Sequence, residues 1–249
     1  MKRAEDSQFD PKAEMNRMSR RSFLWSAFAV GGSYVAWKWI NSQPLEGGLV
    51  APLRRSLEFN QGFVEATYGI GRLSPEFPAS SMQPIRTNGA VGTRKEFTEA
   101  ASWKLRLDTA DGVQTISMKE LLELPIHEYV TQLRCVEGWS RVNRFEGFRI
   151  SEFLAKFAPR TVLPFMALET PGAEYYVGLE RESFMHPQAM LCIAMNGEPL
   201  RPENGAPLRL ALPIKYGYKQ LKNVGIIQLL NTQPRDYWAE RGYDWFAGL

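Results

Sequence analysis

The side chains best placed to do chemistry lie in residues 132–140, where Cys135 stands between an arginine and a Glu-Gly-Trp turn. The positive charge of Arg134 favours the thiolate, which is the form of cysteine that binds metals and acts as a nucleophile. Taken alone, however, these residues favour a buried, inert cysteine. A hydrolase nucleophile would need a histidine partner, and neither His127 nor His186 stands in a recognisable partner motif.

The other cysteine and histidine residues limit the metal chemistry of the chain. Among 249 residues there are two cysteines and two histidines, which are too few for a Cys/His zinc cluster or a disulfide framework. Cys192 lies in the apolar run 190–195 and is expected in the core. Any metal must therefore arrive with a cofactor.

Two stretches carry a resemblance to a known family. Residues 134–140 read Arg-Cys-Val-Glu-Gly-Trp-Ser, and residues 202–222 contain Asn-Gly-Ala-Pro followed by Lys-Tyr-Gly-Tyr-Lys. The first resembles the cysteine motif of the sulfite oxidase family of molybdopterin-dependent oxidoreductases, and the second resembles its Asn-Gly-Ala-Pro and Lys-Tyr-Gly-aromatic-Lys signature. The likeness extends roughly from Trp103 to Tyr237, and it is greatest to the bacterial branch of periplasmic methionine-sulfoxide reductases.

The resemblance implies a cofactor and the residues that hold it. Cys135 would be the only protein ligand of a molybdenum that a pterin dithiolene otherwise binds, in keeping with the preference of soft centres for sulfur. The pterin carries a phosphate, for which Arg209 offers a bidentate fork and Lys222 a point charge. The other implied contacts are Thr170, Asn204, Gln220 and Leu221, with Arg86 and Asn88 as candidates in the loop 85–90. Without the resemblance each would be read as a loop hydrogen bond or a solvated charge.

The reaction expected is oxygen-atom transfer, with Cys135 and Glu137 as the catalytic residues. Glu137 matches an acidic residue that faces the metal in the methionine-sulfoxide reductase branch, although a carboxylate in an ordinary turn is the alternative. An acid beside the metal disfavours sulfite, because an anionic substrate needs a cationic pocket. The substrate expected is thus a small sulfoxide or similar oxo-acceptor. The alternatives are a sulfite-oxidase-like dehydrogenase and a non-catalytic exported module with a pterin fold.

Electrons must come from a second protein, because the sequence contains no Cys-x-x-Cys-His haem attachment and no flavin fingerprint. We expect a membrane subunit that carries haem or is linked to quinol. The chain ends at Leu249, soon after the last motif, which leaves no room for the dimerising domain of eukaryotic sulfite oxidases. A monomeric catalytic subunit is therefore expected.

The elements that must position these residues are mostly strands. Residues 103–117 alternate apolar and polar side chains around Asp111-Gly112, which predicts a hairpin. Short apolar runs at 162–169, 175–179, 190–195 and 208–212 predict further strands. Two short helices are expected at Met118–Leu124, capped by Ser117, and at Ile150–Phe157. The fold class predicted is α+β, as a single molybdopterin-binding domain.

The first 40 residues are expected to be an export leader. Ser-Arg-Arg-Ser-Phe-Leu at 19–24 precedes an apolar stretch, which is the twin-arginine pattern and predicts a periplasmic protein. The stretch 23–39 is borderline in length for a membrane span, so an uncleaved inner-membrane anchor and a cleaved leader are both compatible with it. Residues 41–56 are expected to be a linker and 57–249 the domain.

The net charge gives no reason to expect nucleic acid. Of the formal +3, the first 21 residues contribute six Lys/Arg against four Asp/Glu, so the rest is nearly neutral. Binding to phosphate backbones needs a basic stripe, and no such run follows residue 60. The partners expected are a small-molecule substrate and the electron donor.

Overall fold

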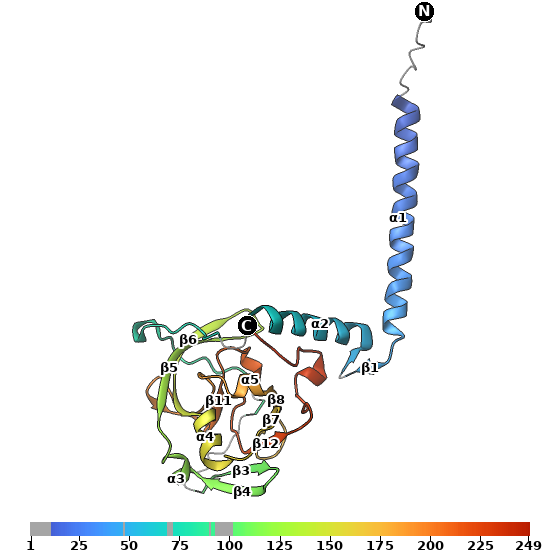
Figure 1. The fold of residues 1–249 in the computed structure, drawn as a ribbon. Coiled ribbons are helices and arrows are strands. Elements are labelled where there is room, and N and C mark those ends of the chain that lie inside the picture. The colour runs from blue at the N-terminus through green and yellow to red at the C-terminus, as the bar shows by residue number, and fades with distance from the viewer. Residues whose placement is uncertain (1–10, 47, 69–71, 90, 93–101) are drawn as a thin grey trace, which may run out of the picture. The chain divides into compact units, whose positions relative to one another are not determined.

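The computed structural model describes residues 11–46, 48–68, 72–89, 91–92 and 102–249 (Figure 1). The chain divides into two compact units, residues 1–55 and 56–249. Ala90, the last residue of the expected pterin loop, lies outside the described residues.

The first unit is mainly helical. Its long helix α1 (Pro11–Asn41) contains the paired arginines and the apolar stretch. Among the described residues, no helix has both the length and the apolarity that a membrane crossing requires.

Secondary structure also forms inside the range 41–56. β1 (Leu45–Glu46) pairs with β2 (Leu49–Val50), and α2 (Ala51–Tyr68) begins at once. Gly48, at φ 83°, supplies the left-handed turn of this hairpin. Pro52 is the second residue of α2, a position in the first turn of a helix where proline is tolerated.

Two five-stranded sheets form most of the second unit, with β5 and β6 on one side and β3, β4, β7, β8 and β12 on the other (Figure 1). The first sheet has the order β10-β9-β6-β5, and β11 also pairs with β9; the second has the order β4-β3-β12-β7-β8. Only β12 and β3 pair in parallel among the strands described. The strands are β3 (Lys104–Thr109), β4 (Gly112–Ser117), β5 (His127–Arg134), β6 (Ser140–Arg149), β7 (Phe165–Glu169), β8 (Tyr176–Glu180), β9 (Met190–Met195), β10 (Glu198–Pro199), β11 (Arg209–Ala211) and β12 (Ile226–Leu230).

Short helices connect the strands, and the α+β fold class is confirmed. They are α3 (Met118–Leu121), α4 (Ile150–Phe157) and α5 (Arg181–Phe184), with single 3-10 turns at Ala79–Ser81, Pro202–Asn204, Gly217–Lys219 and Ala239–Arg241. Ser117 caps α3 in a capping box with Glu120, as the sequence predicts. This helix ends at Leu121, three residues earlier than predicted, because a residue before proline, here Leu124, disfavours helical backbone.

The main core lies between the sheets and includes Leu105, Phe148, Phe153 and Leu210, each fully buried. α4 contributes Ile150, Phe153 and Leu154 from one face, as expected for an amphipathic helix. Sequence analysis missed β6, the longest of the described strands, whose apolar residues alternate with Arg, Asn and Glu. This strand matters for function because it begins directly after the turn that contains Cys135.

Candidate active site

Cys135 lies in a tight turn between β5 and β6. Its N–H donates to the Trp139 carbonyl at 2.9 Å, and the Gly138 N–H donates back to the Cys135 carbonyl at 3.1 Å. Gly138 has φ 85°, a backbone conformation that favours glycine. Pairing of β5 with β6 from His127↔Gly147 to Arg134↔Ser140 fixes both ends of this turn and thereby the half-buried thiol.

The thiol opens into a cavity of about 270 Å³. Eight of the ten predicted site residues line this cavity: Cys135, Glu137, Arg86, Asn88, Asn204, Arg209, Gln220 and Lys222. These residues come from segments far apart in the sequence, so their convergence is a property of the tertiary structure.

Thr170 and Leu221 are not among the lining residues. Thr170, buried at the end of β7, accepts a hydrogen bond from the Tyr175 N–H at 3.2 Å, and it is the Tyr175 side chain that lines the cavity. Leu221 is fully buried in the main core. The Leu221 carbonyl accepts from the Leu210 N–H at 2.8 Å. This bond joins the two backbone segments that carry Arg209 and Gln220.

One end of the cavity is cationic and deeply buried. Arg209 has only 4% of its surface exposed, and its Nη1 donates to the Asn204 carbonyl at 3.1 Å. Burial lowers the pKa of Arg209 to about 10, so it remains charged at neutral pH. Burial, with the nearby Arg209 charge, lowers the pKa of Lys222 to about 8. Gly205 (φ 101°) lets the Asn204 turn approach Lys222, because a Cβ there would lie 2.8 Å from the Lys222 Cα.

The other end surrounds the thiol with polar groups. The Glu137 carboxylate accepts from the Trp139 indole at 2.9 Å and from the Asn88 amide at 3.3 Å. These bonds, Trp139 first, lower the pKa of Glu137, which is therefore ionised at neutral pH. The Asn88 amide also lies 3.9 Å from the Cys135 sulfur. Arg86 stacks on the Trp139 ring at 4.4 Å from its centroid, as a cation–π pair.

The expectation that Arg134 favours the Cys135 thiolate is wrong for the metal-free protein. Burial is the main cause that raises the pKa of this thiol, and the Glu137 charge adds to it. The cation that partly offsets them is Arg86, whereas Arg134 donates its Nε to Gln132 at 2.9 Å. A coordinated metal deprotonates a thiol outright, so the thiolate would form on metal binding.

Five aromatic side chains line the cavity and form what we call the aromatic wall: Trp139, Tyr175, Tyr218, Trp238 and Tyr243. Sequence analysis assigned none of them to the site. Tyr175, Trp238 and Tyr243 line the cavity but stand in no motif. Tyr218 and Trp139 lie within the quoted motifs without an assigned role. The Tyr218 and Tyr243 ring centroids are 5.4 Å apart, and those of Trp238 and Tyr243 are 5.0 Å apart. Tyr175, Tyr218 and the Trp238–Tyr243 pair come from different segments of the chain, so no local pattern indicates that they line one cavity.

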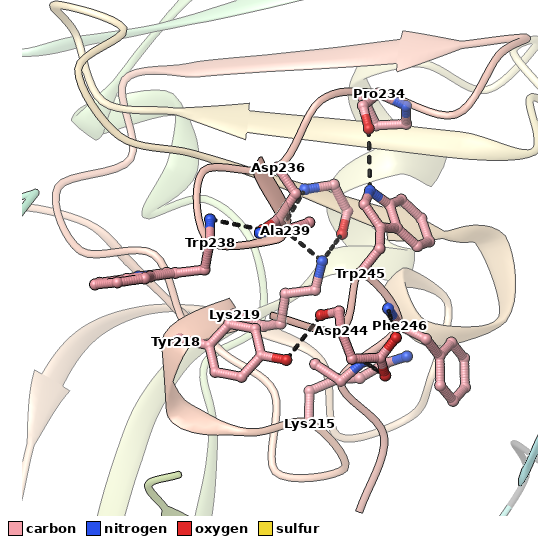
Figure 2. Close-up of polar contacts among 12 residues, drawn as sticks. Lys215, Tyr218, Lys219, Pro234, Asp236, Trp238, Ala239, Asp244, Trp245 and Phe246 are labelled. Carbon is pink, nitrogen blue, oxygen red and sulfur yellow. Dashed lines mark hydrogen bonds and ion pairs between the residues drawn. The ribbon is translucent and has the colours of Figure 1, made fainter. Parts of the chain in front are cut away.

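The two lysines of the signature do not reach the cavity. Lys219 donates to Asp236 at 2.6 Å, and both side chains are fully buried; Figure 2 shows this pair beside Trp245. Lys215 pairs with Glu180 at 2.7 Å and lies over the Phe246 ring. These lysines anchor the chain around the site and do not bind within it.

The donors of the cavity fit a pterin with a metal at one end and a phosphate at the other. Among the described residues, Arg209 Nε and Gln220 Oε1 are buried without a hydrogen-bond partner, and buried polar groups of this kind call for a ligand. Arg209 and Lys222 suit a phosphate, and the soft sulfur of Cys135, on the same cavity, suits molybdenum. The fold and this donor set define a molybdenum-dependent oxidoreductase.

Comparisons with known proteins agree with a molybdenum-dependent oxidoreductase. The family model "Oxidoreductase molybdopterin binding domain" matches residues 91–238. The YedZ1 protein of Azospira oryzae, provisionally named as a subunit of protein-methionine-sulfoxide reductase, is 27% identical over 92% of this chain and 88% of its own. MsrP, the protein-methionine-sulfoxide reductase catalytic subunit, is 31% identical in Campylobacter jejuni and 36% in Xanthomonas campestris, over 64% and 51% of this chain. These two matches span 60% and 44% of the length of the MsrP relatives.

A solved structure shares the fold. The sulfane dehydrogenase SoxCD from Paracoccus pantotrophus superposes with a TM-score of 0.51 over 66% of this chain and 46% of its own, at 18% identity. The chain belongs to the sulfite oxidase family of molybdopterin-binding oxidoreductases, and its cofactor is molybdenum-molybdopterin. The alternative of a non-catalytic module is not supported.

Proposed function

We propose that this chain is the catalytic subunit of an exported reductase that acts on sulfoxides, with methionine sulfoxide as the substrate class. The observation that carries the proposal is Cys135, on a cavity wall next to Glu137 and Asn88, in a chain 31–36% identical to MsrP proteins over the matched segments. Twin-arginine export to the periplasm and a haem- or quinol-linked membrane donor belong to this proposal.

The reaction is a two-electron reduction. The sulfur–oxygen bond breaks, the sulfur gains two electrons, and the oxygen leaves as water after taking two protons. When bound, the cofactor supplies the electrons, which the partner delivers singly, and accepts the oxygen atom. Cys135 holds the metal, while Arg209, Lys222, Asn204 and Gln220 orient the pterin from the buried end. Arg86 and Asn88 close the outer wall.

Sulfite oxidation is the second candidate, and one observation favours it. Arg86 and Arg141 line the same cavity as Glu137, and neither forms an ion pair among the described residues. Glu137 taken alone would repel sulfite. This argument is weaker in the folded protein, because arginine is well suited to bind an anion and two arginines line the cavity.

A dye-linked assay of the molybdenum-loaded protein separates the two. We expect kcat/KM for methionine sulfoxide reduction to exceed that for sulfite oxidation by at least about a hundredfold, or ~2.7 kcal/mol in transition-state stabilisation. Glu137→Gln should narrow the gap by raising sulfite turnover, whereas Glu182→Gln, at an exposed site outside the cavity, should not. Efficient sulfite oxidation by the wild-type protein would refute the reductase assignment and point to Arg86 and Arg141 as anion-binding residues.

A further inference from the structure

One wall of the cavity is formed by a segment in which no residue is buried. Residues 72–89, which we call the strap, contribute Arg86, Asn88 and Gly89 to the lining, and no residue of the strap is buried. Other lining residues are fixed in the interior: Asn143 is 2% exposed, Met195 2%, Asn204 5%, Arg209 4% and Gln220 4%. Ile85 is partly buried against the second core cluster, but no apolar side chain of the strap is fully buried. A segment with few buried apolar contacts opens locally at low free-energy cost, so the strap is a wall of the cavity that can open.

The first anchor of the strap is the Gln188 side chain. Its Oε1 accepts from the Ser74 N–H at 2.8 Å, and its Nε2 donates to the Ser74 carbonyl at 3.0 Å. Gln188 itself is 2% exposed, so the domain provides a rigid amide to which the strap binds. Next to it, the Phe77 N–H donates to the Val130 carbonyl of β5 at 2.9 Å.

The second anchor holds Gln83. The carbonyl of Gln83 accepts from two side-chain amides, Asn143 Nδ2 at 3.1 Å and Asn196 Nδ2 at 3.0 Å. The Gln83 N–H donates to the Val142 carbonyl of β6 at 2.9 Å. The first anchor also includes the Glu76 carboxylate, which accepts from Gln188 Nε2 at 3.4 Å. The other hydrogen bonds of the two anchors join amide groups, each of modest net stability in water.

Beyond the second anchor the strap reaches the groups proposed to hold the pterin. Lys222 Nζ donates to the Asn88 carbonyl at 2.9 Å, and the Thr87 hydroxyl lies 3.3 Å from Asn204 Oδ1. A pterin phosphate would compete with the Asn88 carbonyl for the Lys222 ammonium group. Displacement of the strap would thus expose the cavity and at the same time release a donor that the cofactor needs.

We propose that the strap is the removable wall through which the pterin cofactor enters and leaves, and that Gln188 and Asn196 are positioning residues that control this step. The proposal rests on the proposed cofactor site. Neither side chain lines the cavity, so both act through the strap and not on the cofactor.

Two nearly isosteric variants test this in the molybdenum-loaded full chain. Gln188→Glu keeps an acceptor for the Ser74 N–H but removes the donor to the Ser74 carbonyl. Asn196→Asp keeps the acceptor that binds the Arg144 N–H at 2.8 Å and tolerates the left-handed backbone at φ 52°, but it cannot donate to Gln83. The matched control is Gln114→Glu, because Gln114 donates to the Phe157 carbonyl at 2.6 Å, outside both strap and cavity.

Hydrogen exchange of residues 72–89 and the rate of molybdenum release are measured for each single variant and for the pair. We expect exchange in the strap and release of molybdenum each to become at least about tenfold faster in the paired variant, and both to stay at wild-type rates in the control. Faster exchange with unchanged release would overturn the proposal, because the cofactor would then pass elsewhere. Unchanged exchange would show that these amides do not hold the strap.

The same measurements separate this proposal from the proposed activity. Molybdenum release does not depend on which substrate the enzyme reduces, so a protein inactive on sulfoxides still tests the strap. A wild-type chain that binds no molybdenum after expression in a pterin-competent host would refute the cofactor site and the strap proposal with it. An equal gain in release for Gln114→Glu would indicate general destabilisation and also refute it.

Discussion

At the scale of single residues, the structure divides the charged and polar groups of the site into two functions. Cys135 lines the cavity beside Glu137 and Asn88, whereas Arg209, which also lines it, is almost fully buried. Burial raises the pKa of the Cys135 thiol, and a coordinated metal would favour its thiolate form.

Cys135→Ser should abolish turnover, because a hydroxyl is a harder ligand than a thiolate for molybdenum. We expect less than about a tenth of wild-type activity with an artificial electron donor, a loss of at least ~1.4 kcal/mol in the activation barrier. The dye-linked assay measures turnover, and metal analysis measures the molybdenum that the variant retains. A variant above that limit would show that Cys135 is not the ligand.

Cys192 provides the control for this substitution. It is fully buried on β9, and burial raises its pKa to about 12, so it is a core thiol. Cys192→Ala should lower the melting temperature but leave molybdenum bound. Loss of metal by a folded Cys192→Ala protein would contradict this assignment.

Lys222 predicts a pH dependence of cofactor release. Its pKa of about 8 means that the ammonium group loses its proton as the pH rises through that value, and attraction to the pterin phosphate then weakens. Bound phosphate stabilises the charged form, so the effect should begin somewhat above pH 8 in the loaded protein. Cofactor release should accelerate in the upper part of the range from pH 7 to about 9, which stays below the pKa of about 10 of Arg209.

Two substitutions check that Lys222 is the group responsible. Lys222→Arg keeps its charge throughout the range, because guanidinium titrates above ~12, and should release cofactor at a nearly constant rate. Lys222→Met should release it faster at every pH. A wild-type pH profile in Lys222→Met would assign the dependence to another group.

At the scale of elements, a buried ion pair joins Lys219, in the segment after β11, to Asp236, in the segment after β12. Lys219 donates to Asp236 and to the Gly178 carbonyl of β8, the latter at 2.7 Å. Asp236 also accepts the N–H groups of Trp238 and Ala239, as Figure 2 shows. This pair holds Tyr218 and Trp238, the neighbours of its two residues, at the cavity.

Lys219→Met should destabilise the domain by about 3–5 kcal/mol, because it leaves Asp236 as an uncompensated buried charge. Lys219→Met with Asp236→Asn should recover part of this loss, since asparagine still accepts the backbone N–H groups. Urea unfolding of the metal-free protein measures both. The surface pair Lys156–Glu123 is the control, and Lys156→Met should cost no more than ~1 kcal/mol.

At the scale of the whole molecule, the proposed export signal and the cavity lie in different units. The paired arginines lie in residues 1–55, apart from the unit that contains the cavity. The strap proposal bears on export as well, because a pathway that carries folded proteins requires the cofactor to be inserted, and the strap closed, before transport.

Replacing both Arg20 and Arg21 by lysine should retain the protein in the cytoplasm, because lysine does not reproduce guanidinium geometry. Cell fractionation with immunodetection measures the distribution. Molybdenum content should be normal, since the cofactor site lies in the other unit. Periplasmic protein at wild-type levels would show that the leader is not of the twin-arginine type.

The sequence by itself determined the family, the cofactor, the α+β class and eight of the ten residues that prove to line one cavity. It could do so because the turn at Cys135 and the Asn204–Lys222 segment are local patterns. Only the tertiary structure decided that Thr170 and Leu221 are buried next to the lining residues and do not line the cavity. It also decided that the charge of Arg86, and not that of Arg134, lowers the pKa of the Cys135 thiol. The two signature lysines, Lys215 and Lys219, are buried in ion pairs. The tertiary structure also revealed the aromatic wall and the anchors of the strap. Each of these depends on contacts between distant segments, whose distances and burial are set only when the sheets pack together.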